Sequence, residues 1–412
     1  MAGSPRTKSG RRRAVIIGGS MSGLFTAAFL RKVGWDVDVY ERSPVELVGR
    51  GAGITTHPEL LDALEASGAG TRDLGVTVER RITLDRDGRV IGERHLPQIL
   101  TSWDRLQRLL RETIDPAHYH LGRTFVRVEQ DGRRVRVRFA EGGEEEADLL
   151  VGGDGIHSGV RAQVAPDVRP IYSGYFSWRG TANEADLAPE TLESIFPYFT
   201  FFLPGERHQI IGYAIAGFDN DLRPGRRRYN FIWHRVGEPN ELRKMCIDEN
   251  GRQHDFSVPP HLVRKSLVGD MRAEAASMMP AAFLDVLAKI KQPFFTPIND
   301  FSSPSLVYGR VALVGDAAST SRPHMGFGVS KAGGDAQALA EALREHGGDV
   351  DAALDEYNAV RQPIGERIML HGRKLGAHFG VNLKTDEDRY WWNLLQSHEE
   401  VMDRIGTPNF LE

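Results

Sequence analysis

The sequence predicts an α/β protein in which a domain of alternating strands and helices is interleaved with a domain built on an antiparallel sheet. Short apolar runs that end in glycine-rich turns occur near both ends of the chain, at 14–19 and 311–316. Between them lie four segments rich in aromatic and β-branched residues, separated by turn clusters, which is typical of an antiparallel sheet. Because the first and last units share one pattern, we interpret the middle of the chain as an insertion.

The chain has 412 residues, or two to three domains at about 150 residues each. We expect a flexible basic tail over 1–13, the first part of the strand–helix domain over 14–170, the antiparallel-sheet domain with helices over 171–295, the second part of the strand–helix domain over 296–385, and a C-terminal segment over 386–412.

The N-terminal unit reads as strand, turn, helix and strand. Residues 14–17 form an apolar run that ends at Gly18-Gly19. Helical spacing then runs from Gly23 to Gly34, a residue type that commonly ends helices. Apolar residues alternate with polar ones over 37–40, as in a second strand.

The later elements follow from the same rules. We expect a hairpin about Asp131-Gly132 within 124–139 and a strand over 148–151. The aromatic and β-branched segments are 172–181, 198–203, 209–216 and 228–235. Residues 240–290 are mostly helical in pattern, 311–314 form a last buried strand, and 328–345 form a helix.

Composition and charge exclude several classes of protein. No apolar run approaches the roughly 18 residues of a membrane helix, and a net charge of −4 argues against binding to nucleic acid or to an anionic membrane. The only cysteine, Cys246, excludes an intrachain disulfide framework and any multi-cysteine metal site. The histidines are too scattered for a metal motif, so we expect no metal. We expect a cytoplasmic protein.

The turn after the first strand has the pattern of a Rossmann-like dinucleotide site. Gly18 permits the tight bend and Gly23 the close approach of helix to strand, whereas Ser20 replaces the usual middle glycine. A pyrophosphate would lie on the helix N-terminus, formed by Ser20, Met21 and Ser22. Glu41 follows the second strand, where it can accept hydrogen bonds from a ribose.

Two further motifs place an aspartate directly after a buried strand. Asp154 stands in Gly152-Gly153-Asp154-Gly155, and Asp316 follows Gly315. Gly326-Phe327-Gly328 then opens a helix whose N-terminal dipole favours a negative charge. Each motif alone is compatible with a simple turn, but the three together and in this order are far more specific.

This ordered set resembles the group A flavoprotein monooxygenases, the p-hydroxybenzoate hydroxylase-like aromatic hydroxylases. The resemblance covers the chain from Ala14 to about Tyr357, and within the family the segments 174–180, 229–233 and 322–324 are most similar to those of hydroxypyridine hydroxylases. It implies that the Rossmann-like domain binds FAD and that the substrate lies beneath the antiparallel sheet. The FAD-binding residues that it implies are Gly18, Ser20, Met21, Ser22, Gly23, Glu41, Arg42, Gly51, Gly53, Arg105, Asp154, Gly315, Asp316, Gly326 and Gly328.

Within that set, the resemblance implies that Asp316 binds the ribityl chain of FAD. It implies that Asp154 takes part in binding both FAD and the nicotinamide cofactor. The chain departs from the family pattern at two places. Phe327 stands where glutamine is usual, and Trp103 stands where many members have an FAD-binding arginine, a role that either passes to Arg105 or is lost in this chain.

The resemblance also implies the reaction. NADH or NADPH, with NADH favoured, reduces the flavin; O2 then forms a C4a-hydroperoxide that delivers oxygen to an electron-rich ring carbon. A hydroxylated pyridine is a suitable substrate because its hydroxyl activates an otherwise electron-poor ring. Hydroxylation at a substituted carbon would expel the side chain, as for a 6-hydroxy-3-succinoylpyridine. The family implies a homodimer.

Two residues are our candidates for catalysis, which requires a group that accepts a hydroxyl proton. His324 lies in the loop expected to border the flavin, and Tyr213 lies on a central strand of the substrate sheet. Thr55 and His57 are candidates for the substrate pocket. Each has an alternative structural explanation: a loop-capping histidine, or a core tyrosine whose hydroxyl is satisfied.

Other functions remain open at this point. The same scaffold serves phenolic-acid hydroxylases and flavin oxidoreductases that do not hydroxylate. A simple NAD-dependent dehydrogenase would be colourless and would not need Gly315-Asp316. A non-enzymatic binding protein on a decayed scaffold would oxidise no NADH.

Overall fold

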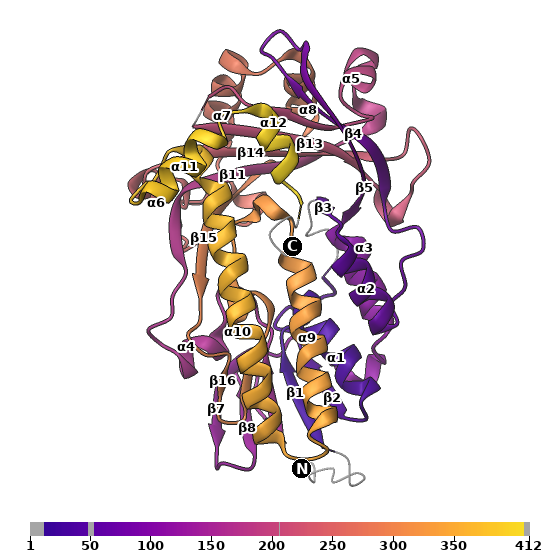
Figure 1. Cartoon of the computed structure of the whole chain (residues 1–412), viewed down its shortest axis with the longest axis vertical. Helices are drawn as coiled ribbons and strands as arrows, with labels where there is room; N and C mark the ends of the chain where they lie inside the picture. Colours follow the sequence, from indigo (N-terminus) through magenta and orange to yellow (C-terminus); the bar gives the residue numbers. More distant parts are fainter. Residues whose placement is uncertain (1–11, 48–52, 206, 408–412) are drawn as a thin grey trace.

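Two large sheets organise the molecule, one in the lower half of Figure 1 and one in the upper half. The computed structural model describes residues 12–47, 53–205 and 207–407. The predicted fold class, an α/β domain interleaved with an antiparallel-sheet domain, is confirmed.

The lower sheet is the nucleotide-binding type of sheet. Its order is β16-β17-β10-β1-β2-β6, with parallel pairing from β17 to β6 and an antiparallel hairpin between β16 and β17. The strands are β1 (Arg13–Ile17), β2 (Asp36–Tyr40), β6 (Tyr119–His120), β10 (Leu149–Gly152), β16 (Val307–Tyr308) and β17 (Val311–Leu313). The central strands β1, β10 and β17 are buried on both faces, which explains their continuous apolar runs.

The upper sheet has the order β18-β15-β11-β14-β13-β12-β4-β5-β3 and is antiparallel apart from the β4–β12 pair. Its strands are β3 (Gly53–Thr55), β4 (Val76–Leu84), β5 (Val90–Ser102), β11 (Ile171–Asn183), β12 (Phe199–Phe202), β13 (His208–Ile215), β14 (Arg228–Val236), β15 (Phe294–Ser302) and β18 (Ser319–Thr320). A small separate sheet contains β7 (Phe125–Gln130), β8 (Val135–Phe139) and β9 (Glu144–Ala147).

The helices cover both sheets. They are α1 (Met21–Lys32), α2 (Pro58–Ser67), α3 (Trp103–Glu112), α4 (Gly159–Val164), α5 (Pro189–Ser194), α6 (Pro239–Met245), α7 (Lys265–Met278), α8 (Ala281–Lys289), α9 (Gly328–Glu345), α10 (Val350–Leu375), α11 (Asp386–Leu394) and α12 (His398–Arg404). Helices α9 and α10 run side by side along the lower half (Figure 1). Within the described ranges, no helix is long and apolar enough to cross a membrane.

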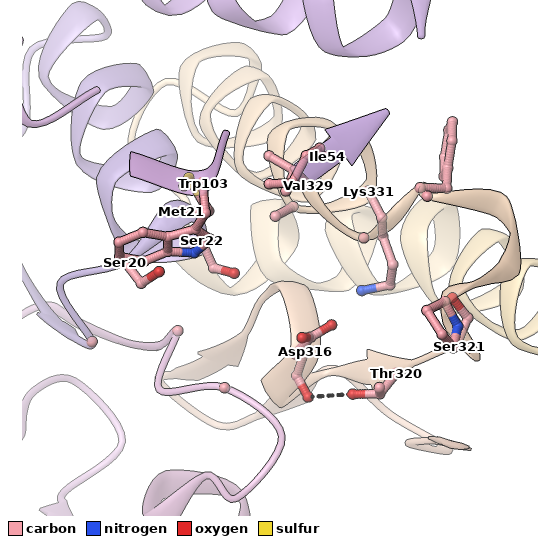
Figure 2. Close-up of a pocket in the computed structure, with 18 of the residues that line it drawn as sticks. Ser20, Met21, Ser22, Ile54, Trp103, Asp316, Thr320, Ser321, Val329 and Lys331 are labelled. Carbon is pink, nitrogen blue, oxygen red and sulfur yellow. Dashed lines mark hydrogen bonds between the residues drawn. The ribbon is translucent and has the colours of Figure 1, made fainter. Parts of the chain in front are cut away.

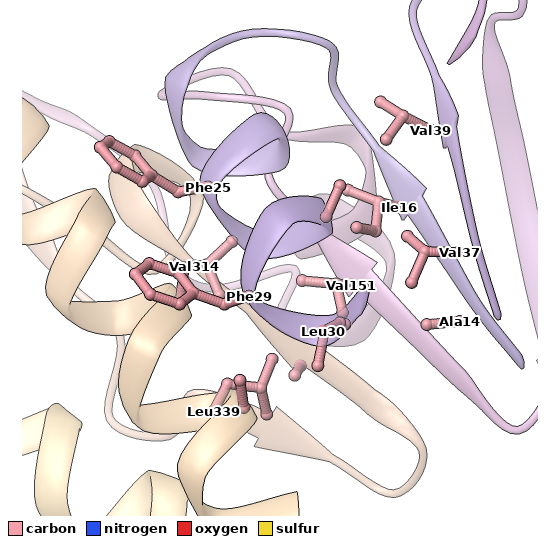
Figure 3. Packing of buried hydrophobic residues seen from close by; sticks show 14 of the residues in the cluster. Ala14, Ile16, Phe25, Phe29, Leu30, Val37, Val39, Val151, Val314 and Leu339 are labelled. Carbon is pink, nitrogen blue, oxygen red and sulfur yellow. The ribbon is translucent and has the colours of Figure 1, made fainter. Parts of the chain in front are cut away.

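Helix α1 packs between the lower sheet and α9. Its Phe25, Phe29 and Leu30 contact a core that includes Val151, Val314 and Leu339 (Figure 3). These residues come from β10, from the loop after β17 and from α9. The first and last parts of the chain therefore share one core, as the interleaved arrangement predicts.

The upper sheet has two different faces because successive side chains of a strand alternate. Phe176 and Trp178 of β11 pack with Phe283 of α8 in one core, whereas the alternate residues of the same strand face the lower domain. This alternation places polar side chains of β11 on the face that borders the cavity described below.

The β4–β5 hairpin was not predicted. Its strands and β3 lie within 14–170, which the sequence analysis assigned to the Rossmann-like domain, but they extend the upper sheet. Strand β15 and strand β18, from the predicted second part of that domain, also join this sheet. The predicted domain boundaries stay a prediction. The chain crosses between the lower and the upper sheet more often than those boundaries imply.

Candidate active site

A cavity of about 660 Å³ lies between the two sheets. Its lower wall comes from the turn after β1, the end of β2 and the loop after β17, and its upper wall comes from the polar face of the upper sheet. Figure 2 shows Ser20, Met21 and Ser22 on one side of this space and Asp316 and Lys331 on another. One cavity thus reaches residues that the sequence assigned to cofactor binding and residues that it assigned to the substrate.

The turn after β1 requires glycine at two positions. Gly18 has a φ of +107°, and a Cβ atom there would lie 2.3 Å from the carbonyl oxygen of Gly153. A Cβ atom at Gly23 would lie 1.8 Å from the carbonyl oxygen of Gly18. The turn therefore brings the N-terminus of α1 close to β10. The N–H groups in the first turn of α1 have no partner within the helix, and Ser20, Met21 and Ser22 at this end of the helix line the cavity.

Glu41 holds this turn from the end of β2. The N–H groups of Gly19 and Ser43 each donate to one of its carboxylate oxygens at 2.8 Å. Each oxygen keeps further acceptor capacity, and Glu41 lines the cavity although it is only 7% exposed. Arg42 lines the same wall.

Asp154 caps a short helix at the edge of the cavity. Its carboxylate accepts hydrogen bonds from the Ser158 hydroxyl and from the N–H groups of Gly159 and Val160. Burial raises the pKa of Asp154, and these hydrogen bonds oppose that effect. The side chain therefore fixes the loop after β10 and also borders the cavity.

A buried ionic network fixes the loop after β17. The Lys331 ammonium donates to the Gly315 carbonyl and to Asp335, each at 2.8 Å. Asp335 also accepts from the Gly315 N–H at 2.9 Å and from Arg361 at 2.8 Å. Burial alone would raise the pKa of Asp335, but Lys331 and Arg361 lower it overall.

This network aims Asp316 at the cavity. No hydrogen bond or ion pair to its carboxylate is present in the described part of the chain, and the dashed line to Thr320 in Figure 2 ends on the backbone oxygen of Asp316. Burial raises the pKa of Asp316, while Lys331 and Arg161 lower it. The carboxylate is available to a polar group in the cavity.

The N-terminus of α9 closes the same wall. Gly326 has a φ of +67°, and a Cβ atom there would lie 1.8 Å from the Thr55 hydroxyl oxygen. Gly326, Gly328 and Thr55 all line the cavity. Gly53 lines it as well and donates its N–H to Asn230 at 3.0 Å, whereas Gly51 lies outside the described residues.

Tyr213 faces the cavity from β13. Its ring stacks on Phe199 with centroids 4.9 Å apart, and no hydrogen bond to its hydroxyl is present in residues 12–47, 53–205 and 207–407. Burial raises the pKa of Tyr213, and the nearby Arg179 lowers it. The phenol therefore keeps its proton near neutral pH and lines the cavity.

His324 is held by a tyrosine of the upper sheet. Its Nε2 lies 2.6 Å from the Tyr175 hydroxyl, and its Nδ1 has no hydrogen-bond partner among the described residues. The cationic Arg322 lies beside Tyr175, with its guanidinium carbon 5.7 Å from the ring centroid. With the Tyr175 hydroxyl as donor to Nε2, neutral His324 carries its ring proton on Nδ1.

His324 is a weaker base than the sequence analysis expected. Burial lowers its pKa well below 6.5, and the neighbouring His234 and Arg322 lower it further. His234 lies on β14 with its ring centroid 5.0 Å from that of His324, and its Nδ1 lies 2.6 Å from the Ser177 hydroxyl. Burial likewise holds the pKa of His234 well below its usual value.

Comparison with known proteins assigns the chain to a family. A family model described as "FAD binding domain" matches residues 11–202 and 271–371, and a second described as "FAD binding domain-like" matches residues 172–300. The chain belongs to the FAD-binding domain family. The predicted resemblance to group A aromatic hydroxylases is confirmed.

Relatives within the FAD-binding domain family include hydroxypyridine monooxygenases. The 2,6-dihydroxypyridine 3-monooxygenase of Paenarthrobacter nicotinovorans is 34% identical over 89% of this chain and 91% of its own length. The solved structure of 2,6-dihydroxypyridine-3-hydroxylase from Arthrobacter nicotinovorans has a TM-score of 0.84 and 31% identity, over 90% of this chain and 93% of that one. The 6-hydroxynicotinate 3-monooxygenase of Pseudomonas fluorescens is 25% identical over 92% of this chain and 94% of its own.

The residues of the cavity fit the FAD that the family name implies. The N-terminus of α1 faces it without a side-chain cap, as a pyrophosphate requires. Glu41 and Asp316 present acceptor oxygens to sugar-type hydroxyls, and the free carboxylate of Asp316 has no protein partner that a ligand must displace. In the described residues, no three His, Cys, Asp or Glu side chains gather closely enough to hold a metal ion.

Gly23 and Gly315 lie behind the cavity wall, and two predicted site residues that carry side chains also lie outside the cavity lining. His57 does not line the cavity; its Nε2 lies 2.9 Å from the Met325 carbonyl oxygen, and burial lowers its pKa to about 4. Arg105 points away and donates to the Arg72 carbonyl oxygen at 2.6 Å. Trp103, Arg42 and Arg123 line the wall that Arg105 was expected to reach.

Sequence reasoning missed four residues that line or support the substrate side: Tyr175, Ser177, Arg179 and His234. Tyr175, Ser177 and Arg179 lie on β11 in the segment 174–180 that the family resemblance had already singled out, and His234 lies on β14, one residue beyond the segment 229–233. Alternation along the predicted strand would have grouped Tyr175, Ser177 and Arg179 on one face. Nothing in the sequence, however, shows which face borders the cavity.

Proposed function

We propose that this enzyme hydroxylates a ring carbon of a hydroxylated pyridine or a similar aromatic ring, with NAD(P)H and O2 as co-substrates. The observation that carries the proposal is a single cavity shared by the FAD-type cradle and by Tyr213 and His324 of the substrate side. The 34% identity to a 2,6-dihydroxypyridine 3-monooxygenase supports the substrate class. When bound and reduced, FAD supplies O2-derived electrophilic oxygen to an electron-rich carbon.

The chain's own residues orient the ring and exclude water. Phe199, Ile211 and Ile232 supply apolar walls. The Tyr213 hydroxyl and the Nδ1–H of His324 donate hydrogen bonds to a ring hydroxyl or to its ionised form. Stabilising the ionised form raises the electron density of the ring, so these donors act by orientation and electrostatics.

The reductant, the assembly and the compartment are further parts of the proposal. We expect NADH rather than NADPH, a homodimer, and a cytoplasmic location supported by the lone, buried Cys246. Parallel assays with the two nicotinamides and sedimentation analysis of the purified enzyme test the first two.

The decisive experiment follows the fate of oxygen. The purified protein should be yellow, release FAD on acid denaturation, and oxidise NADH faster in the presence of a hydroxypyridine. Mass spectrometry after incubation with 18O2 should show one labelled oxygen on the ring, and loss of a substituent would show in the same spectrum. A product oxygen derived from water, or flavin turnover without hydroxylation for every ring offered, would contradict the proposal.

A further inference from the structure

Arg179 is a half-buried cation on the substrate side of the cavity. It lies on β11, opposite Ile232 of β14 and Phe294 of β15. Its side chain lines the cavity beside Tyr213 and His234. A guanidinium stays protonated in proteins, so this wall of the pocket carries a positive charge, although burial lowers the pKa of Arg179.

Among the residues that the structure describes, none neutralises this charge. In the described ranges, no carboxylate lies within ion-pairing distance of Arg179 and no hydrogen bond to its side chain is present; its Nε is buried without an acceptor. The uncompensated burial of a charge is unfavourable. A ligand that brings an anion to this position would therefore gain more than an uncharged one.

The fully buried arginines among the described residues have acceptors, whereas the half-buried Arg179 has none. Arg322 donates to Asp300 at 2.8 Å. Arg81 donates to the carbonyl oxygens of Met402 and Ile405, and Arg161 donates to that of Ala317 at 3.1 Å. Arg322 also lines the cavity, but its guanidinium is paired with Asp300, whereas Arg179 lines the substrate side without such a partner.

The surroundings of Arg179 specify the ligand further. Ile211 and Ile232 offer apolar contact to a flat ring, and the free hydroxyl of Tyr213 lies beside the guanidinium. The planar fork of arginine matches the two oxygens of a carboxylate. We propose that Arg179 binds a carboxylate on the substrate ring, so that the preferred substrates are hydroxylated pyridine or benzene carboxylates rather than hydroxypyridines without an acidic substituent.

This inference rests on the proposed function, but a binding measurement tests it without turnover. The FAD-loaded enzyme is titrated with 6-hydroxynicotinate and with 6-hydroxynicotinamide, in which an uncharged carboxamide replaces the carboxylate, and binding is followed by the change in flavin absorbance. We expect the wild type to bind the acid at least about tenfold more tightly than the amide, because hydrogen bonds between charged partners are the strong ones.

Two variants assign that preference to Arg179. Arg179→Met should weaken binding of the acid about tenfold to a hundredfold and leave binding of the amide within about threefold. Arg179→Lys should restore part of the preference because it keeps the charge but loses the fork. Arg169→Met, at an exposed position, is the matched control and should bind both compounds like the wild type.

The outcomes separate the two proposals. Equal binding of acid and amide by the wild type, or an unchanged preference in Arg179→Met, would overturn the carboxylate site. So would an Arg179-dependent preference for 2,6-dihydroxypyridine over 6-hydroxynicotinate, or a loss of FAD in Arg179→Lys, which would assign the guanidinium to the cofactor. If the acid binds through Arg179 but no ring is ever hydroxylated, the proposed function is wrong and the anion site stands.

Discussion

Replacing Lys331 with methionine should destabilise the loop that carries Asp316. Lys331 is 3% exposed and donates two hydrogen bonds of 2.8 Å, to the Gly315 carbonyl and to Asp335. Methionine keeps an unbranched apolar side chain but removes both bonds. The Gly315 carbonyl is then left without this donor, and Asp335 keeps only Arg361 as a cationic partner.

The magnitude follows from the cost of breaking a buried ion pair, about 3–5 kcal/mol. Because Arg361 still pairs with Asp335, we expect the lower end, a loss of about 3 kcal/mol in the free energy of unfolding. Equilibrium urea unfolding measures it, with enzyme first freed of FAD so that ligand binding does not contribute. Lys289→Met, on an exposed turn of α8, should change stability by no more than about 0.5 kcal/mol.

The pH dependence gives a second readout of the same network. The pKa of Asp335 is lowered in the folded state, so its ion pairs stabilise the protein above the unfolded pKa of about 3.9, and that stabilisation is lost as the pH falls through the lower folded pKa. The stability difference between wild type and Lys331→Met should shrink below about pH 4. A variant that loses less than about 1 kcal/mol at neutral pH would refute the reasoning, because a buried pair would then contribute no more than an exposed one.

Three other predictions concern the ligands. Glu41→Ala and Asp316→Ala should each weaken FAD binding about tenfold to a hundredfold, by loss of a charged acceptor worth about 1.5–3 kcal/mol; flavin fluorescence titration measures this, and unchanged affinity in both variants would exclude them from the cofactor site. His324→Ala should slow hydroxylation by about 10²–10³-fold with FAD still bound, as for the loss of one hydrogen-bond donor to a developing anion, and because the pKa of His324 lies well below 6.5, the wild-type rate should show no step near pH 6.5 that the variant abolishes. Tyr213→Phe should have a milder effect on hydroxylation, since the ring and its stacking on Phe199 remain; in rapid-reaction kinetics, an effect as large as that of His324→Ala would mean that the hydroxyl does more than orient the ring.

The sequence predicted the parts of the site that depend on local backbone. Gly18 and Gly23 are required by close approaches within one turn, and Glu41 follows from its place after β2. Such requirements appear as residue types at fixed spacing. The strands at 172–181 and 228–235 were likewise visible from their aromatic and β-branched residues and the turn clusters between them.

The remaining parts depend on tertiary contacts. The β4–β5 hairpin was missed because charged residues such as Arg80, Arg81 and Arg94 interrupt its apolar pattern; Arg81 is buried only because the carbonyl oxygens near Met402 lie over it. The side chain of His57 points to the Met325 carbonyl oxygen, which belongs to a residue more than 250 positions away in the sequence. Arg179 has no hydrogen-bond or ion-pair partner among the described residues, and no local sequence pattern can predict such an absence.

Alternate residues of strand β11 lie at regular intervals along the substrate side of the cavity. Tyr175, Ser177 and Arg179 share one face, and alternate residues of an extended strand lie about 6.5–7 Å apart. Tyr175, which supports His324, and Arg179, which offers a positive charge, are therefore about two such steps apart. The rigid backbone of the strand, rather than a flexible side chain, sets this separation. If Arg179 anchors the substrate as proposed, moving the charge by one such step would displace a bound ring by more than its own width, so the strand backbone sets whether the ring reaches the reacting position at all.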